Sequence, residues 1–96
     1  MKKMLRVKNK NRVITIDSDN DVCLYDSPDA RSYMVHKTPL GETYFYVIHF
    51  IEWKKPHYTV LSEEEIKTRL SKYNTFSIEE MRHIKKYFPS FFEMMK

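Results

Sequence analysis

Histidine and cysteine are the side chains in this sequence best suited to acid–base, nucleophilic or metal chemistry. The histidines are His36, His49, His57 and His83. No two of them have the HxH or HxxxH spacing that directs two imidazoles from one element to a single metal ion. Cys23 stands alone between Val22 and Leu24, which is typical of a packed thiol and excludes both an internal disulfide and a cysteine-based zinc site. We therefore expect no metal, no cofactor and no catalytic residue.

An acidic run from Asp17 to Asp21 has the composition of a calcium loop but not its spacing. The EF-hand loop has Gly at its sixth position and Glu at its twelfth, whereas this chain has Val22 and Pro28 there. The run is instead typical of a polar turn between strands. Gly41 is the only glycine, so the glycine-rich phosphate loops of P-loop and dinucleotide-binding proteins are excluded.

The chain has 96 residues and a net charge of +4, and its basic residues are concentrated at the N-terminus. The cations of this basic segment are Lys2, Lys3, Arg6, Lys8, Lys10 and Arg12. Such a segment can bind the phosphates of a nucleic acid or an acidic protein surface. The commoner explanation of such a charge run is a solvated strand whose lysines prevent edge-to-edge pairing. The sequence leaves both interpretations open.

Aromatic side chains make up 15% of the chain and are concentrated between Thr43 and Tyr58, beside Lys54 and Lys55. Aromatic strand faces next to cations can stack single-stranded bases, although the glycine-containing motif of the RRM is missing. The same side chains suit a protein interface, where Tyr and Trp contribute much of the binding energy. A small domain also needs them to fill its core. Core, protein interface and nucleic-acid surface therefore stay as alternatives.

Alternating apolar residues and turn signals predict strands over the first two thirds of the chain. The expected strands cover residues 13–16, 22–25, 32–37, 43–53 and 57–60. We expect the first two to pair as a hairpin around the acidic run. Thr38-Pro39-Leu40-Gly41 predicts a turn. Residues 43–53 are apolar on both faces, which is typical of a central strand covered on two sides.

Two capping boxes predict helices in the last third of the chain. Ser62 is followed three residues later by Glu65, and Ser77 by Glu80, while Pro89 ends the second helix. The sequence thus predicts a single α+β domain over residues 1–96. It consists of an antiparallel meander of four or five strands (about 3–60), two C-terminal helices (about 62–88) packed on one face, and an apolar tail (89–96).

Two short helices can cover only one face of such a sheet, so we expect the other face to stay partly open. An open apolar face is typical of a partner-binding site or a homodimer seam. The residues predicted to bind a partner there are Phe45, His49, Ile51, Trp53, Lys54 and Lys55. The basic N-terminal segment is the alternative site, for nucleic acid.

The segment from His36 to Tyr46, HKTPLGETYFY, followed by Val60 to Ile66, VLSEEEI, resembles small uncharacterised proteins of bacterial mobile elements and prophages. Those proteins are similar in having a T-x-x-G turn, an aromatic strand and then PLSEEEA at the start of a helix that contains a Trp. This chain differs in having Val60 for the Pro, Ile66 for the Ala and Arg69 near the position of the Trp. The resemblance implies a phage or mobile-element origin and no particular activity.

These observations predict a small non-enzymatic binding protein that occupies a surface of a host macromolecule. The expected partner is a host protein, such as a nuclease carrying its nucleic acid, and the resemblance suggests an inhibitor of bacterial defence nucleases of the anti-CRISPR kind. The alternatives are a basic nucleic-acid-binding module and a toxin-like ribonuclease, which would need His36, His49 or His57 near a cation.

Even with His49 included, the longest apolar run is the eight residues 44–51, far short of the roughly twenty that span a bilayer. No apolar segment follows the first cations as it does in a secretory signal. We therefore expect a cytoplasmic protein without membrane contact.

Overall fold

The computed structural model of this chain describes residues 1–7 and 11–95. Its elements are β1 (Lys2–Val7), β2 (Arg12–Asp17), β3 (Val22–Asp26), β4 (Arg31–Lys37), β5 (Thr43–His49), β6 (His57–Leu61), α1 (Glu63–Leu70), α2 (Ile78–Tyr87) and the 3-10 turn η1 (Phe92–Met95). The four strands β3 to β6 form an antiparallel meander, and β1 and β2 form a separate antiparallel hairpin. The predicted α+β fold, a strand meander followed by two helices, is confirmed.

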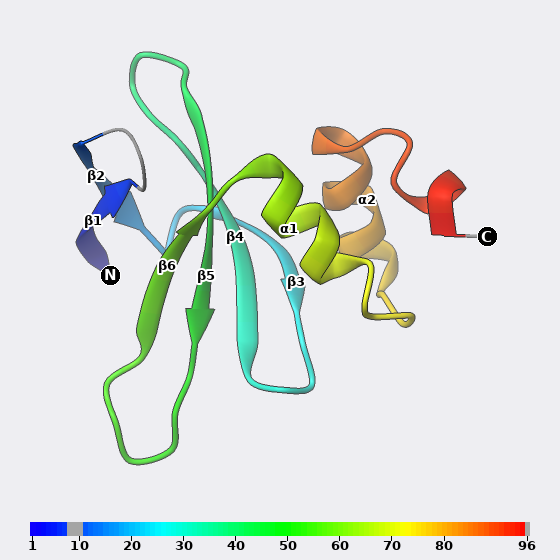
Figure 1. The fold of residues 1–96 in the computed structure, drawn as a ribbon, viewed down its shortest axis with the longest axis horizontal. Helices are drawn as coiled ribbons and strands as arrows, with labels where there is room; N and C mark the ends of the chain where they lie inside the picture. The colour runs from blue at the N-terminus through cyan, green and yellow to red at the C-terminus, as the bar shows by residue number, and fades with distance from the viewer. Residues whose placement is uncertain (8–10, 96) are drawn as a thin grey trace.

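The molecule has three layers, with the four-stranded sheet in the middle (Figure 1). The β1–β2 hairpin lies against one face of the sheet, and α1 and α2 lie against the other. The buried residues between sheet and hairpin are Leu5, Val7, Ile14, Ile16, Met34, Tyr44, Tyr46, Ile48 and Val60. Those between sheet and helices are Leu24, Tyr25, Tyr33, Val35, Phe45, Val47, Leu61, Ile66, Leu70, Ile84, Phe88 and Phe91. Each face of the sheet thus packs against its own apolar layer.

β5 is the strand whose alternating side chains supply both layers. Phe45 and Val47 face the helices, whereas Tyr44, Tyr46 and Ile48 face the hairpin. The prediction that one face of the sheet stays partly open is therefore wrong for the described residues. The basic N-terminal segment covers that face because its two strands carry an apolar inner side between their charged residues.

The predicted hairpin between residues 13–16 and 22–25 is also wrong, because β2 pairs with β1. In that pairing Leu5 lies opposite Ile14, so that buried side chains of both strands share the inner side of the hairpin. The acidic run does form a turn, in which the backbone N–H of Asp21 donates to the carbonyl oxygen of Asp17 at 2.8 Å. This turn leads the chain from the hairpin layer into the sheet layer.

Both predicted capping boxes are present and define where the helices begin. The Ser62 hydroxyl accepts from the N–H of Glu65, and the Glu65 carboxylate accepts from the N–H of Ser62. Ser77 and Glu80 make the same reciprocal pair at the start of α2. The second helix ends at Tyr87, two residues before proline, as the sequence predicts.

Side chains of α2 cover the backbone of the edge strand β3. Glu80 accepts the N–H of Asp26 at 3.0 Å, and Nδ1 of His83 lies 3.0 Å from the carbonyl oxygen of Cys23. These contacts occupy groups that an incoming strand would use, so this edge is partly closed to strand addition.

Candidate binding site at the end of the sheet

The loop between β5 and β6 projects from one end of the four-stranded sheet (Figure 1). The predicted strand over residues 43–53 ends at His49, and one further ladder hydrogen bond follows, from the N–H of Phe50 to the carbonyl of Ala30 in the β3–β4 turn at 2.9 Å. The N–H of Lys54 then donates to the carbonyl of Ile51 at 3.1 Å and closes a turn. Residues 50–56, called the Trp53 loop below, therefore form a loop where the apolar pattern predicts the end of a strand.

Trp53 is the most prominent residue of this loop. It is 95% exposed, and its φ of 64° lies in the left-handed region. A residue other than glycine adopts that region at a cost of about 1–2 kcal/mol. Lys54 and Lys55 follow it directly and are exposed, whereas His49 and Ile51 are half-buried at the base of the loop. An exposed indole beside two ammonium groups is an arrangement suited to binding a partner.

Phe45 does not belong to this site, which corrects the prediction that it lies on a partner-binding surface. Its ring centroid is 5.2 Å from that of Phe88 and 6.2 Å from that of Tyr87, and the residue is buried. The sequence places Phe45 on the same strand face as Trp53, but the strand ends before position 53. Alternation along β5 therefore gives no information about the loop.

A row of basic side chains crosses the sheet at the base of the Trp53 loop. His49 of β5 lies opposite Arg31 of β4 on one side and opposite His57 of β6 on the other. Directly opposite residues share a face of the sheet and have Cβ atoms about 5 Å apart. Alternation from Phe45 and Val47 places this row on the side that the helices cover.

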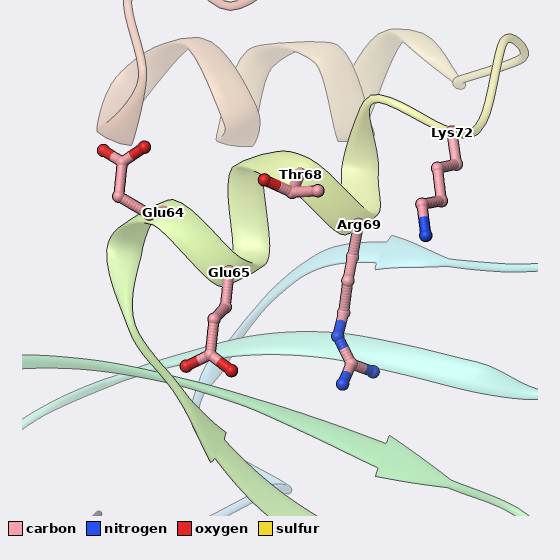
Figure 2. A pocket seen from close by; sticks show the side chains of 5 residues that line it. All are labelled: Glu64, Glu65, Thr68, Arg69 and Lys72. Carbon is pink, nitrogen blue, oxygen red and sulfur yellow. The ribbon is translucent and has the colours of Figure 1, made fainter. Parts of the chain in front are cut away.

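Helix α1 adds a further cation next to this row. Figure 2 shows the Arg69 side chain extending from α1 toward the strands, beside a hollow of about 310 Å³ whose lining residues are Glu64, Glu65, Thr68, Arg69 and Lys72. No carboxylate lies within ion-pair distance of Arg69 among the described residues. Burial raises the pKa of the Tyr33 hydroxyl, and the nearby Arg69 charge opposes that rise.

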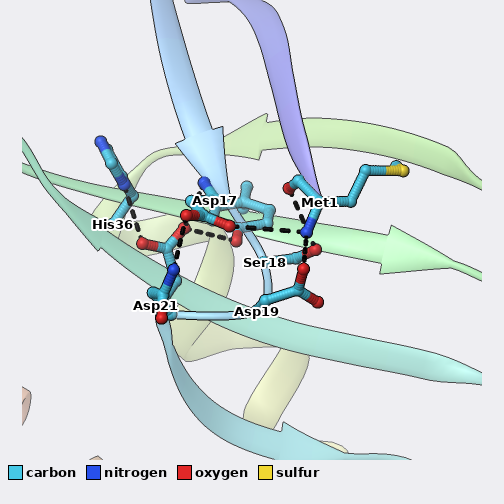
Figure 3. Close-up of polar contacts among 8 residues, drawn as sticks. Met1, Asp17, Ser18, Asp19, Asp21 and His36 are labelled. Atoms are coloured by element: carbon cyan, nitrogen blue, oxygen red, sulfur yellow. Dashed lines mark hydrogen bonds and ion pairs between the residues drawn. The ribbon is translucent and has the colours of Figure 1, made fainter.

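A second cluster of polar groups surrounds Asp21 in the turn between β2 and β3 (Figure 3). The Asp21 carboxylate accepts from the hydroxyl of Tyr46 at 2.7 Å and from the N–H of Asp17 at 3.1 Å, and Nδ1 of His36 lies 2.8 Å from it. Burial and the hydrogen bond to Asp21 raise the pKa of the Tyr46 hydroxyl. We interpret the cluster as the link that holds this turn on the sheet, because each donor comes from a different strand.

His36 also borders a groove of about 390 Å³ between β2 and the β4–β5 turn. The groove brings His36 near Arg12, the kind of pair that the ribonuclease alternative requires. Arg12 Nη1, however, donates to a Glu42 carboxylate oxygen at 2.7 Å, and its guanidinium lies over the Tyr44 ring. The charge of Arg12 is thus already matched within the fold.

The basic N-terminal segment is divided by the structure. Lys3 Nζ lies 4.7 Å from the centroid of the Tyr58 ring on β6, so this lysine fastens β1 to the sheet. Lys2 and Arg6 are exposed on β1, and Lys8 and Lys10 lie outside the described residues.

Cys23 is a packed thiol, as the sequence suggests. Burial, followed by the charge of Asp26, raises its pKa to about 12. The thiol therefore stays protonated at neutral pH and is a poor nucleophile.

Within the described part of the chain, no group of three His, Cys, Asp or Glu side chains is arranged to hold a metal ion. Likewise, none of the described helices has the length and apolar character needed to cross a membrane.

Sequence reasoning missed Arg31 in the basic row and Arg69 beside it. β5 and β6 pair on either side of the Trp53 loop, and this register brings His49 opposite His57. The position of Arg69 depends on how α1 packs on the sheet, which no local pattern encodes.

Compared with known proteins, the chain matches no family model, no curated protein and no solved structure.

Proposed function

We propose that this protein is a small, non-enzymatic binding protein that covers a surface of a host macromolecule through the Trp53 loop. The observation that carries the proposal is the 95% exposure of Trp53 on a left-handed backbone. An indole in water does not stabilise the fold, whereas at the centre of an interface it is among the strongest anchors. Lys54 and Lys55 would accelerate association with an acidic partner.

The remaining polar chemistry supports binding in preference to catalysis. The Asp21 carboxylate is engaged by three donors within the fold, and the charge of Arg12 is matched by Glu42. Cys23 is held as a thiol by burial. The carboxylate of Asp21, the guanidinium of Arg12 and the thiol of Cys23 are therefore engaged within the fold, whereas a catalytic group must be able to react with a substrate.

The target we propose is a nuclease of bacterial defence, inhibited in the manner of an anti-CRISPR protein in the host cytoplasm. The resemblance of residues 36–46 and 60–66 to proteins of mobile elements supports this choice. The compact size and the single prominent anchor are consistent with an inhibitor that acts by covering a surface.

The experiment compares the wild type with Trp53→Ala and Leu40→Ala. Leu40 is a matched control because it is 86% exposed in the β4–β5 turn, at the opposite end of the sheet from the Trp53 loop. Each tagged variant is expressed in cells with an active CRISPR nuclease. The plating efficiency of a targeted phage and the nuclease retained on the tagged protein are then measured.

We expect the wild type and Leu40→Ala to protect the phage and to retain the nuclease. Trp53→Ala should lose at least about tenfold in affinity, which is about 1.4 kcal/mol. Failure of the wild type to protect or to bind would contradict the nuclease as target. Equal binding by all three proteins would contradict the Trp53 loop as the contact.

A further inference from the structure

The basic row at the base of the Trp53 loop is left uncovered by the helices. Val35, Phe45 and Leu61 form a buried row under α1 and α2. Four residues further toward the loop, His57 is exposed and Arg31 and His49 are half-buried. The helix layer therefore ends before the sheet does.

Lys54, Lys55, Arg69 and Lys72 lie around this uncovered end, and none of them has an ion-pair partner among the described residues. Arg69 reaches over the strands from α1, and Lys72 follows it at the end of the helix. The carboxylates at this end are Asp26, Asp29, Glu52, Glu64 and Glu65, and Asp26 accepts from the Ser32 hydroxyl. Asp29 pairs with Arg31 at 2.7 Å and also accepts the Tyr73 hydroxyl, Glu64 pairs with Lys67, and Glu65 caps α1.

The Trp53 loop adjoins the basic row along the chain. Only the seven residues of the Trp53 loop separate His49 from His57, so Trp53, Lys54 and Lys55 lie directly beyond the histidine pair. A guanidinium binds phosphate oxygens through paired N–H donors, and imidazoles donate to the same oxygens. An exposed indole offers a flat face on which any base can stack.

We propose that this surface binds a single-stranded polynucleotide, with phosphates on His49, His57 and Arg69 and a base stacked on Trp53. The inference rests on the proposed function and names the chemistry that the host macromolecule presents there. A single strand fits better than a duplex, because only an unpaired base exposes its face to the indole. The nucleic acid carried by a nuclease would supply such a strand.

The test measures binding of a fluorescently labelled oligothymidylate to the full chain by anisotropy. Trp53 is the only tryptophan, so quenching of its fluorescence reports stacking independently. We expect affinity to fall steeply between about 50 mM and about 200 mM salt. Arg69→Gln should weaken binding several-fold and reduce the salt slope by about one, and Trp53→Ala should weaken binding and abolish quenching by the indole.

Arg82→Gln is the matched control, since Arg82 is an exposed arginine on α2 that pairs with Glu79 at 3.0 Å. It removes the same charge far from the loop and should leave the affinity unchanged. Circular dichroism of each variant confirms that the fold is retained.

Three results would overturn the inference. The first is that the oligonucleotide does not bind at low salt. The second is that Arg69→Gln and Arg82→Gln weaken oligonucleotide binding equally. The third is that polyglutamate binds as tightly as the oligonucleotide, which would identify an acidic protein surface as the ligand. If the oligonucleotide fails to bind while Trp53-dependent retention of a nuclease persists, this inference is wrong and the proposed function stands. If neither occurs, both are wrong.

Discussion

At the residue scale, Trp53 has opposite effects on stability and on binding. Its indole is exposed to water, and its backbone holds a φ of 64° that glycine adopts without strain. We predict that Trp53→Gly raises the free energy of unfolding by about 0.5–1 kcal/mol while abolishing partner binding. Urea denaturation gives the first quantity, and retention of the partner gives the second.

Ala30→Gly is the control for this prediction, because Ala30 has a φ of 62° in the β3–β4 turn. It should stabilise the fold similarly and leave binding intact. A loss of stability in Trp53→Gly alone would show that the indole packs against the protein and is not an available anchor.

Cys23 provides a second prediction at this scale. Because burial raises its pKa to about 12, the thiolate is scarce at any pH where the protein is handled. Iodoacetamide at about pH 8 should therefore alkylate the native protein far more slowly than the urea-unfolded protein, whose thiol has a pKa near 8.5. Mass spectrometry follows the reaction, and equal rates in the two states would show that Cys23 is accessible and reactive.

At the scale of elements, local signals were enough to predict the helices but not the pairing of the strands. A capping box such as Ser62 with Glu65 lies within four residues, so it can be recognised without the rest of the fold. The partner of β2 could be β1 or β3, because both have apolar residues in the right alternation. The choice depends on which pairing lets the hairpin cover the sheet, and that is a non-local property.

The candidate site, too, could be predicted only in part from the sequence. Lys54 and Lys55 could be assigned to a loop from their charge and from Pro56, and the aromatic segment before them marked the region of interest. β5 ends at His49, opposite Arg31, where its partner strand β4 begins, and that partner comes from another part of the chain. The exposure of Trp53 could therefore not be predicted from the strand pattern.

The hairpin layer gives a prediction about stability. Ile16 is fully buried between hairpin and sheet, whereas Val13, three residues earlier on β2, is 52% exposed. Ile16→Ala should lower the free energy of unfolding by about 2–5 kcal/mol, as in a packed core. Val13→Ala should change it by no more than about 0.5 kcal/mol. Urea denaturation measures both, and a similarly small effect of the two substitutions would mean that the hairpin is not a packed layer.

At the scale of the whole molecule, the β1–β2 hairpin covers one face of the sheet and the helices cover the other. The surface available for binding therefore lies at the ends of the sheet. The Cα radius of gyration is 13.3 Å, slightly above the value of about 12.5 Å for a compact domain of this length. The β4–β5 turn and the Trp53 loop project at opposite ends of the sheet (Figure 1). Of these two, only the Trp53 loop combines an aromatic anchor with adjacent cations.

The central claim is that the protein binds its partner through the Trp53 loop. Hydrogen–deuterium exchange of the nuclease complex, compared with the free protein, tests this claim most directly, since it maps protected backbone amides along the chain. We predict that protection on binding is concentrated in residues 49–57 and is absent from the β1–β2 hairpin. Protection concentrated in the hairpin, with residues 49–57 unchanged, would contradict the account and assign binding to the basic N-terminal segment.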